Sequence, residues 1–129
     1  MGPQLNHTIA WCSDKAKSAG FLAHVLGLPE PRRFFHFLVV DLSNDVSIDY
    51  FETDETIALQ HFAFLVSEEE FDSSFHRIGE EGIEYWADPA RTMAGEINHH
   101  DGGRGVYFKD PDGHLLEIIT RPYGSGDKN

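Results

Sequence analysis

The chain has 129 residues, of which 40% are hydrophobic and 12% aromatic, enough for one packed domain or for two small halves that share a core. Its formal net charge of −12 argues against nucleic acid and anionic membranes as partners, because both repel an acidic surface. No apolar run approaches the roughly 20 residues of a membrane span, the N-terminus lacks the features of a signal peptide, and the single Cys12 fits a reducing cytoplasm.

The first half of the chain predicts a strand, a helix and two further strands. Residues 6–12 alternate between polar and apolar and predict the first strand. Ser13 or Asp14 then caps a helix that extends to about Leu26 and is closed by a glycine. The two strands that follow are expected over the ranges 34–42 and 46–52.

The second half begins in the same way. A strand is expected over residues 60–66, and a capping box from Ser67 to Glu70 opens a helix that reaches about Ile78. The remaining expected strands are a short one over 84–87, another near 95–98, and the two arms of a hairpin within 106–120. The turn of that hairpin is Asp-Pro-Asp-Gly, and the histidine after it, His114, is expected to be exposed.

The two halves form an internal repeat. When His7 is placed over His61, an amide, a histidine, an apolar strand, a serine cap and an acid coincide. At the end of each half, Asp49 matches Glu117 inside an apolar strand. Each half therefore predicts a strand, a helix and three strands, although only two of those three are clear in the first half. We expect one domain over 1–129, made of modules at about 5–56 and 58–122, with 123–129 as a tail.

A pseudo-twofold arrangement of these modules would bring matching side chains together. Two imidazoles, His7 and His61, with the carboxylate of Glu117 are a ligand set for a divalent metal such as Fe, Mn, Ni or Zn. A buried carboxylate needs a cation, and for Glu117 the alternatives to a metal are a salt bridge to an Arg or Lys, or a strand edge that reaches water. A single strand histidine is more often an ordinary core or surface residue. Asp49 could be a further ligand, a hydrogen-bond acceptor or a base.

The chain resembles the vicinal oxygen chelate superfamily, which includes glyoxalase I, extradiol dioxygenases, and fosfomycin- and bleomycin-resistance proteins. The resemblance rests on the strands of His7 and His61 and on the motif YFKDPDGHLLEI with its Glu117. It implies an α+β fold in which two βαβββ modules form an open, cup-shaped mixed sheet around a metal. It also implies a homodimer and a substrate whose neighbouring oxygens chelate that metal.

Further motifs resemble the small aromatic-polyketide oxygenases of the chartreusin type: QHFAFLVSEEEFD, EYWADP, GEIN and DGGRGVYFKDPDGHLLEIITRPYG. That branch implies Fe(II), dioxygen, and oxidation of an aromatic or diol-like substrate. Tyr107 precedes Glu117 by ten residues, the spacing of the active-site tyrosine in extradiol dioxygenases. A phenol there can donate a proton or a hydrogen bond, although Tyr107 could equally be an ordinary strand aromatic.

Two other functions remain open at the level of sequence. One is a glyoxalase-type lyase or isomerase, although Asp49 stands where glyoxalase I usually has glutamate. The other is a binding protein for a planar aromatic compound. In the oxygenase interpretation Asp49 takes a proton from a phenolic hydroxyl and Tyr107 steadies the reacting oxygen. The residues expected to contact substrate are Trp11, Tyr50, Trp86 and His100. The substrate, the metal, and the pairing of modules within one chain or between two are not decided by sequence.

Overall fold

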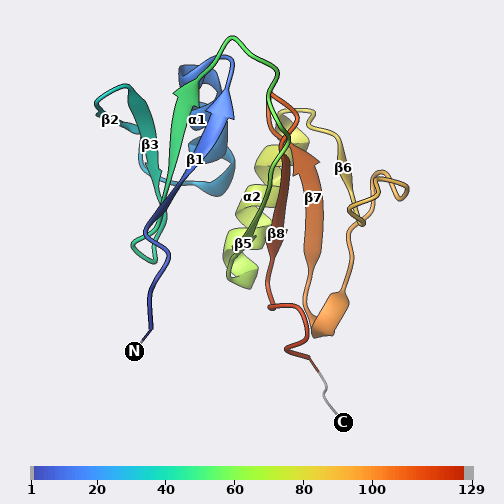
Figure 1. Cartoon of the computed structure of the whole chain (residues 1–129). Helices are drawn as coiled ribbons and strands as arrows, with labels where there is room; N and C mark the ends of the chain where they lie inside the picture. Colours follow the sequence, from blue (N-terminus) through green and yellow to red (C-terminus); the bar gives the residue numbers. More distant parts are fainter. Residues whose placement is uncertain (1, 127–129) are drawn as a thin grey trace. The chain divides into compact units, whose positions relative to one another are not determined.

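The structure is a computed structural model that describes residues 2–126. The chain divides between Ala58 and Leu59 into two compact units. Each unit contains one helix and one four-stranded mixed sheet, with the element order βαβββ (Figure 1). The predicted α+β class and the predicted repeat of βαβββ modules are therefore confirmed. No helix in the described part of the chain is both long and apolar enough to cross a membrane.

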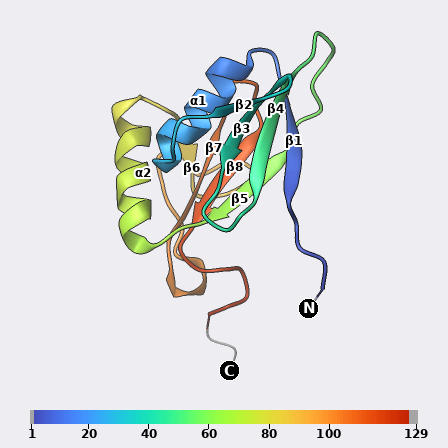
Figure 2. The same cartoon turned by 90° about the vertical axis from the view of Figure 1, so that its left-hand side faces the viewer.

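The first unit is built on a sheet with strand order β1-β4-β3-β2. Strand β1 pairs in parallel with β4, and the other neighbours are antiparallel (Figure 2). The elements are β1 (His7–Cys12), α1 (Lys15–Leu26), β2 (Arg32–Phe34), β3 (Phe37–Asp41) and β4 (Ser47–Glu52). Helix α1 packs on β3 and β4, so one face of this sheet is covered by its helix.

The ends of α1 follow from its capping residues. The Asp14 side chain accepts a hydrogen bond from the Lys17 N–H, which satisfies one of the free donors of the first turn. Gly27 ends the helix in the left-handed conformation, with φ of 67°, which glycine adopts without a steric cost. The predicted boundaries of this helix are confirmed.

The single strand predicted over 34–42 is wrong, because the chain turns inside it. Phe35 has a φ of 53°, and the chain reverses between β2 and β3, which pair in an antiparallel hairpin. A bulky residue in the left-handed region is uncommon, and the turn itself, residues 34–37, contains no Gly, Pro, Asn or Asp to indicate it. Strand β2 is the third strand of the module that the sequence did not make clear.

The second unit repeats the plan, with strand order β5-β8-β7-β6. The elements are β5 (His61–Leu65), α2 (Glu68–Glu80), β6 (Tyr85–Trp86), the short 3-10 helix η1 (His100–Gly102), β7 (Gly105–Lys109) and β8 (Leu115–Ile119). The predicted capping box between Ser67 and Glu70 is present. The strand expected near 95–98 is absent from the described residues; Ala94 and Asn98 form isolated bridges there.

The two units share the same strand register as well as the same topology. On the parallel pairs, Ile9 lies opposite Asp49 and Ala63 lies opposite Glu117. In each unit the histidine is two residues before the partner of the acid, so histidine and acid share one face of their sheet. The repeat therefore places chemically related side chains at equivalent positions of two separate sheets.

Candidate functional site

The face of the second sheet opposite to α2 carries a row of functional side chains. Glu117 lies between Ala63 on β5 and Tyr107 on β7, and Tyr107 pairs in turn with Trp86 on β6. Residues directly opposite one another on neighbouring strands point to the same face. His61 joins this row because it is two residues from Ala63.

His61 and Glu117 form the centre of the row. The Glu117 side chain is fully buried, and its Oε1 lies 3.2 Å from Nε2 of His61. The His61 Nδ1 is 3.0 Å from the carbonyl oxygen of Leu115. A carbonyl can only accept a hydrogen bond, so Nδ1 carries a proton, and in the neutral form of this ring the lone pair is on Nε2.

In the neutral form of His61, the lone pair of Nε2 lies 3.2 Å from the Oε1 atom of Glu117. The Glu117 Oε1 has no hydrogen-bond partner in the described part of the chain. A buried, unpaired carboxylate oxygen is costly, and a cation between Oε1 and Nε2 removes that cost. A neutral imidazole whose other nitrogen donates to a carbonyl, next to a carboxylate, is the donor set that divalent transition metals prefer. The pair therefore fits a metal ion.

The metal donors that the structure brings together are these two residues. Among residues 2–126, no cluster of three or more His, Cys, Asp or Glu side chains is arranged to hold a metal ion. His7 is on β1 of the first unit, where its Nδ1 lies 2.7 Å from Oδ1 of Asn6. Its role as a third ligand stays a prediction.

Two tyrosines hold the other oxygen of Glu117. The Tyr123 hydroxyl donates to Oε2 of Glu117, and the Tyr107 hydroxyl is hydrogen-bonded to Tyr123. Burial raises the pKa of the Tyr107 phenol. Burial and the hydrogen bond to Glu117 raise the pKa of Tyr123. Both phenols are therefore protonated donors, and Glu117 is oriented so that Oε1 stays free for a cation.

The sequence analysis missed Tyr123 because this residue opens the segment treated as a tail. The structure describes this segment as far as Gly126. The Asp101 carboxylate holds it by accepting hydrogen bonds from the N–H groups of Gly124 at 3.1 Å and Gly126 at 3.0 Å. These hydrogen bonds place Tyr123 over Glu117. No local pattern indicates this role, since the partner Asp101 lies in a distant loop.

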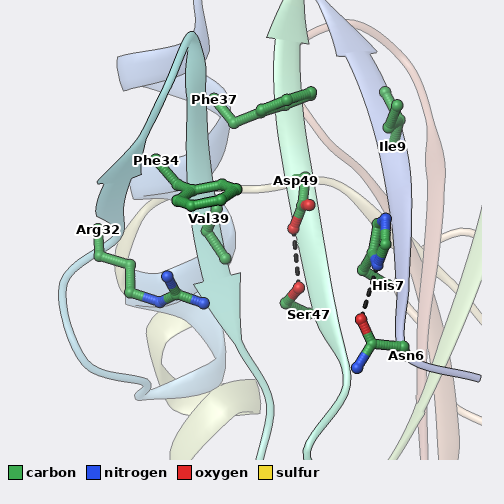
Figure 3. A pocket seen from close by; sticks show the side chains of 9 residues that line it. All are labelled: Asn6, His7, Ile9, Arg32, Phe34, Phe37, Val39, Ser47 and Asp49. Atoms are coloured by element: carbon green, nitrogen blue, oxygen red, sulfur yellow. Dashed lines mark hydrogen bonds between the residues drawn. The ribbon is translucent and has the colours of Figure 1, made fainter.

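The first unit carries a cavity of about 410 Å³ on the face of its sheet that holds His7 (Figure 3). Its polar lining consists of Asn6, His7, Arg32, Ser47 and Asp49. Its apolar lining consists of Ile9, Phe34, Phe37 and Val39. Asp49 is only 8% exposed, and its Oδ1 accepts a hydrogen bond of 2.8 Å from the Ser47 hydroxyl.

Arg32 enters this cavity from β2, a strand that the sequence did not reveal. Its Nε donates to Oδ2 of Asp41 at 2.6 Å and its Nη2 to Oδ1 at 3.1 Å. The hydrogen bond from Arg32 lowers the pKa of the Asp41 carboxyl. Arg32 and Phe34 were missed as site residues for the same reason as the strand itself.

The four residues expected to contact substrate lie in different surroundings. Trp11 is 39% exposed and shares the face of His7, whereas Trp86 is buried in the row of Glu117. The His100 ring, in η1, lies 6.3 Å from that of Tyr123. Tyr50 is 1% exposed and, because side chains alternate along a strand, points to the face of β4 opposite to Asp49. It is therefore a core residue of the first unit, and its contact with substrate stays a prediction.

Residues 4–118 match the model of the Glyoxalase/Bleomycin resistance protein/Dioxygenase superfamily, and the chain belongs to this family. The solved structure named Oxidase ChaP-H2 is 56% identical, with a TM-score of 0.95, covering 98% of this chain and 100% of that one. Oxidase ChaP-H1 is 54% identical, with a TM-score of 0.94, covering 95% and 99%.

Relatives with lower sequence identity are named for other activities. The Glutathione transferase FosA of Serratia marcescens is 32% identical over 121 residues, covering 88% of this chain and 78% of the relative. The Metallothiol transferase FosB of Shouchella clausii (strain KSM-K16) is 29% identical over 121 residues, covering 90% and 79%. With oxidases similar over nearly its full length, the chain is an enzyme of this superfamily.

Proposed function

We propose that this protein is a metal-dependent oxygenase that acts on an aromatic substrate with two neighbouring oxygens, with Fe(II) as its metal. The observation that carries the proposal is the unpaired, buried Oε1 of Glu117, 3.2 Å from Nε2 of His61. The similarity to two solved oxidases supports oxidation over the other reactions of the superfamily.

His61 and Glu117 would hold the metal, with His7 as the predicted third ligand. When bound, the metal would supply open positions for the substrate oxygens and for dioxygen. The donor set of imidazole and carboxylate also suits Mn, Ni and Zn, so Fe(II) is proposed on the similarity to oxidases. The Leu115 carbonyl fixes the ring orientation of His61, and Tyr123 fixes that of Glu117.

The protein's own groups supply the proton movements. Asp49 is the proposed base: one oxygen is held by Ser47, and the other is free to take a proton from a phenolic hydroxyl. Tyr107 is protonated and hydrogen-bonded through Tyr123 to Glu117. Because Tyr123 donates its own proton to Glu117, the Tyr107 hydroxyl donates to Tyr123, and it would donate to a reacting oxygen by giving up that hydrogen bond.

A lyase or transferase that needs the metal but not dioxygen is the second candidate, favoured by the relatives named glutathione transferase and metallothiol transferase. A binding protein for a planar aromatic compound is the third, favoured by the aromatic lining of the cavity in Figure 3. Turnover of hemithioacetals under argon would select the second. Tight binding without turnover, unaffected by a chelator, would select the third.

The test is anaerobic loading with Fe(II), followed by metal analysis and by oxygen uptake with catechols and polycyclic quinols. We expect one metal per chain in the wild type, its loss in His61→Ala and Glu117→Gln, and uptake only with metal. His76→Ala is the matched control, because the His76 side chain is 73% exposed on α2 and, within the described part of the chain, its ion-pair partner is Glu80. Retention of metal by His61→Ala, or no uptake with any substrate, would refute the proposal.

A further inference from the structure

The cavity of the first unit places rings and polar atoms side by side. Phe34 and Phe37 are directly paired across the hairpin of β2 and β3, and both side chains line the cavity. Phe34 is 51% exposed, although it lines the cavity. Figure 3 shows the Arg32 guanidinium below the Phe34 ring and pointing toward Ser47. A large exposed ring beside an oriented cation is typical of a ligand surface.

Arg32 keeps donors for a ligand. Asp41 occupies Nε and Nη2 and so fixes the plane of the guanidinium. Within the described part of the chain, Nη1 donates to no protein acceptor. A guanidinium that is already oriented loses little side-chain entropy when it binds a further oxygen.

Asp49 provides a hydrogen-bond acceptor in the same cavity as the Arg32 donors. Ser47 donates to its Oδ1 at 2.8 Å. Within residues 2–126, its Oδ2 receives no hydrogen bond. Asp49 is 8% exposed, and a hydroxyl that donates to Oδ2 would supply the hydrogen bond that this oxygen lacks within the described residues.

We propose that this cavity is the ring-binding site and takes a planar, fused-ring phenol that also carries a carbonyl or carboxylate oxygen. The rings lie against Phe34 and Phe37, the hydroxyl donates to Asp49, and the second oxygen accepts from Arg32. A volume of about 410 Å³ is in the range of small-molecule sites. The choice of an aromatic ligand rests on the proposed function, but binding needs no metal.

The experiment measures binding to chelator-treated full-length protein, by fluorescence, with three probes. The first is 6-hydroxy-2-naphthoate, which has both polar groups; 2-naphthol lacks the carboxylate, and 2-naphthoate lacks the hydroxyl. We expect Arg32→Gln to weaken 6-hydroxy-2-naphthoate about tenfold and to leave 2-naphthol within about twofold. Phe34→Ala should weaken all three probes, about tenfold or more.

The neighbouring arginine provides a matched control. Arg33→Gln changes the next arginine, which does not line the cavity. This variant should bind like the wild type. Because Arg32→Gln also removes the ion pair with Asp41, circular dichroism and thermal melting confirm that each variant is folded.

The outcomes separate this inference from the proposed function. Loss of binding confined to Arg32→Gln and Phe34→Ala supports the ring-binding site. Equal affinities of Arg32→Gln and Arg33→Gln for 6-hydroxy-2-naphthoate, or no binding to the wild type, overturn it. Normal binding without metal-dependent oxygen uptake would refute the oxygenase and leave the ring-binding site standing.

Discussion

The buried Oε1 atom of Glu117 is the reason for proposing a metal at this site. Its two oxygens lie in different surroundings: Oε2 receives the Tyr123 hydroxyl, and Oε1 faces the His61 ring without a hydrogen bond in the described chain. The asymmetry matters because a carboxylate with one oxygen fixed presents the other in a single direction. Orientation of this kind lowers the entropy lost when a ligand binds.

Tyr123→Phe tests this orientation. The substitution removes the hydrogen bond to Oε2 and keeps the ring, so we expect metal affinity to fall by about tenfold or more while the fold is retained. Titration with Fe(II) or Co(II) under argon measures the change. Tyr85→Phe is the control, since the Tyr85 ring packs against Phe75 at 5.0 Å on the helix side of the sheet. Equal affinities of the two variants would contradict this role.

Asp88 predicts a pH dependence of stability. Its carboxylate accepts from the Thr92 hydroxyl at 2.7 Å and from the N–H groups of Thr92 and Met93, and the Thr92 hydrogen bond lowers the pKa of Asp88. Folding therefore favours the charged form: the contribution is present above the ordinary carboxyl pKa and disappears as pH falls through the lowered value.

Urea unfolding at several pH values measures this dependence. We expect Asp88→Asn to be less stable than the wild type near neutral pH, with the difference shrinking below about pH 4. Asp54→Asn, an exposed loop carboxylate, is the control and should show no such convergence. A difference that is constant down to acid pH would be inconsistent with the lowered pKa of Asp88.

At the scale of elements, one arginine joins the start of β7 to α2. Arg104 Nε donates to Glu68 at 2.8 Å, its Nη1 lies 2.8 Å from Asp72, and its Cζ is 4.4 Å from the centre of the Phe71 ring. The guanidinium thus pairs with two carboxylates while it stacks on a core ring. Since α2 carries the capping box and covers the back of this sheet, the contact stabilises the sheet that holds Glu117.

Arg104→Lys should lower the free energy of unfolding by about 1–2 kcal/mol, because an ammonium cannot form the planar fork and stacks less well. Urea denaturation monitored by circular dichroism gives the value. Arg33→Lys, on the exposed strand β2, is the control, with an expected change below about 0.5 kcal/mol. If both substitutions had the same effect, the planar contacts of Arg104 would not be the cause.

Periodic and capped segments could be predicted from the sequence. Both helices, the Ser67 cap and the hairpin followed from local chemistry that needs no tertiary information, and the first cap was narrowed to Ser13 or Asp14. The equivalent positions of Asp49 and Glu117 in the two sheets also followed, because a repeat keeps its register. The turn at Phe35 could not be predicted, since no turn residue stands there and tertiary packing overrides local preference.

His114 shows why the rest of the site escaped prediction. We expected it to be exposed after the turn, but it is fully buried. Its N–H donates to Asp110 at 2.9 Å, and its Nδ1 accepts from the Gln60 N–H at 2.9 Å. Gln60 is distant along the chain, as Asp101 is from the Tyr123 segment. Polar contacts across such distances leave no periodic pattern in a sequence.

At the scale of the whole molecule, the net charge of −12 bears on assembly. We propose the homodimer implied by the family, and like charges on two copies oppose their association. Added salt screens this repulsion, so the dimer should tighten between about 20 and 300 mM NaCl. Sedimentation velocity checks this against the chain mass of 14.6 kDa. A monomer at every salt concentration would rule out the dimer, and weakening with salt would contradict the screening argument.

The shared register of the two sheets also has an evolutionary consequence. Duplication of one module would produce this register: Asp49 and Glu117 occupy equivalent positions, yet Asp49 lines a cavity, whereas Glu117 is a buried carboxylate held by Tyr123. A duplicated module has two equivalent positions, and the residues around each can change independently. Substitutions around Asp49 would change the shape and polarity of the cavity in the first unit, while Glu117 would keep its contacts with His61 and Tyr123.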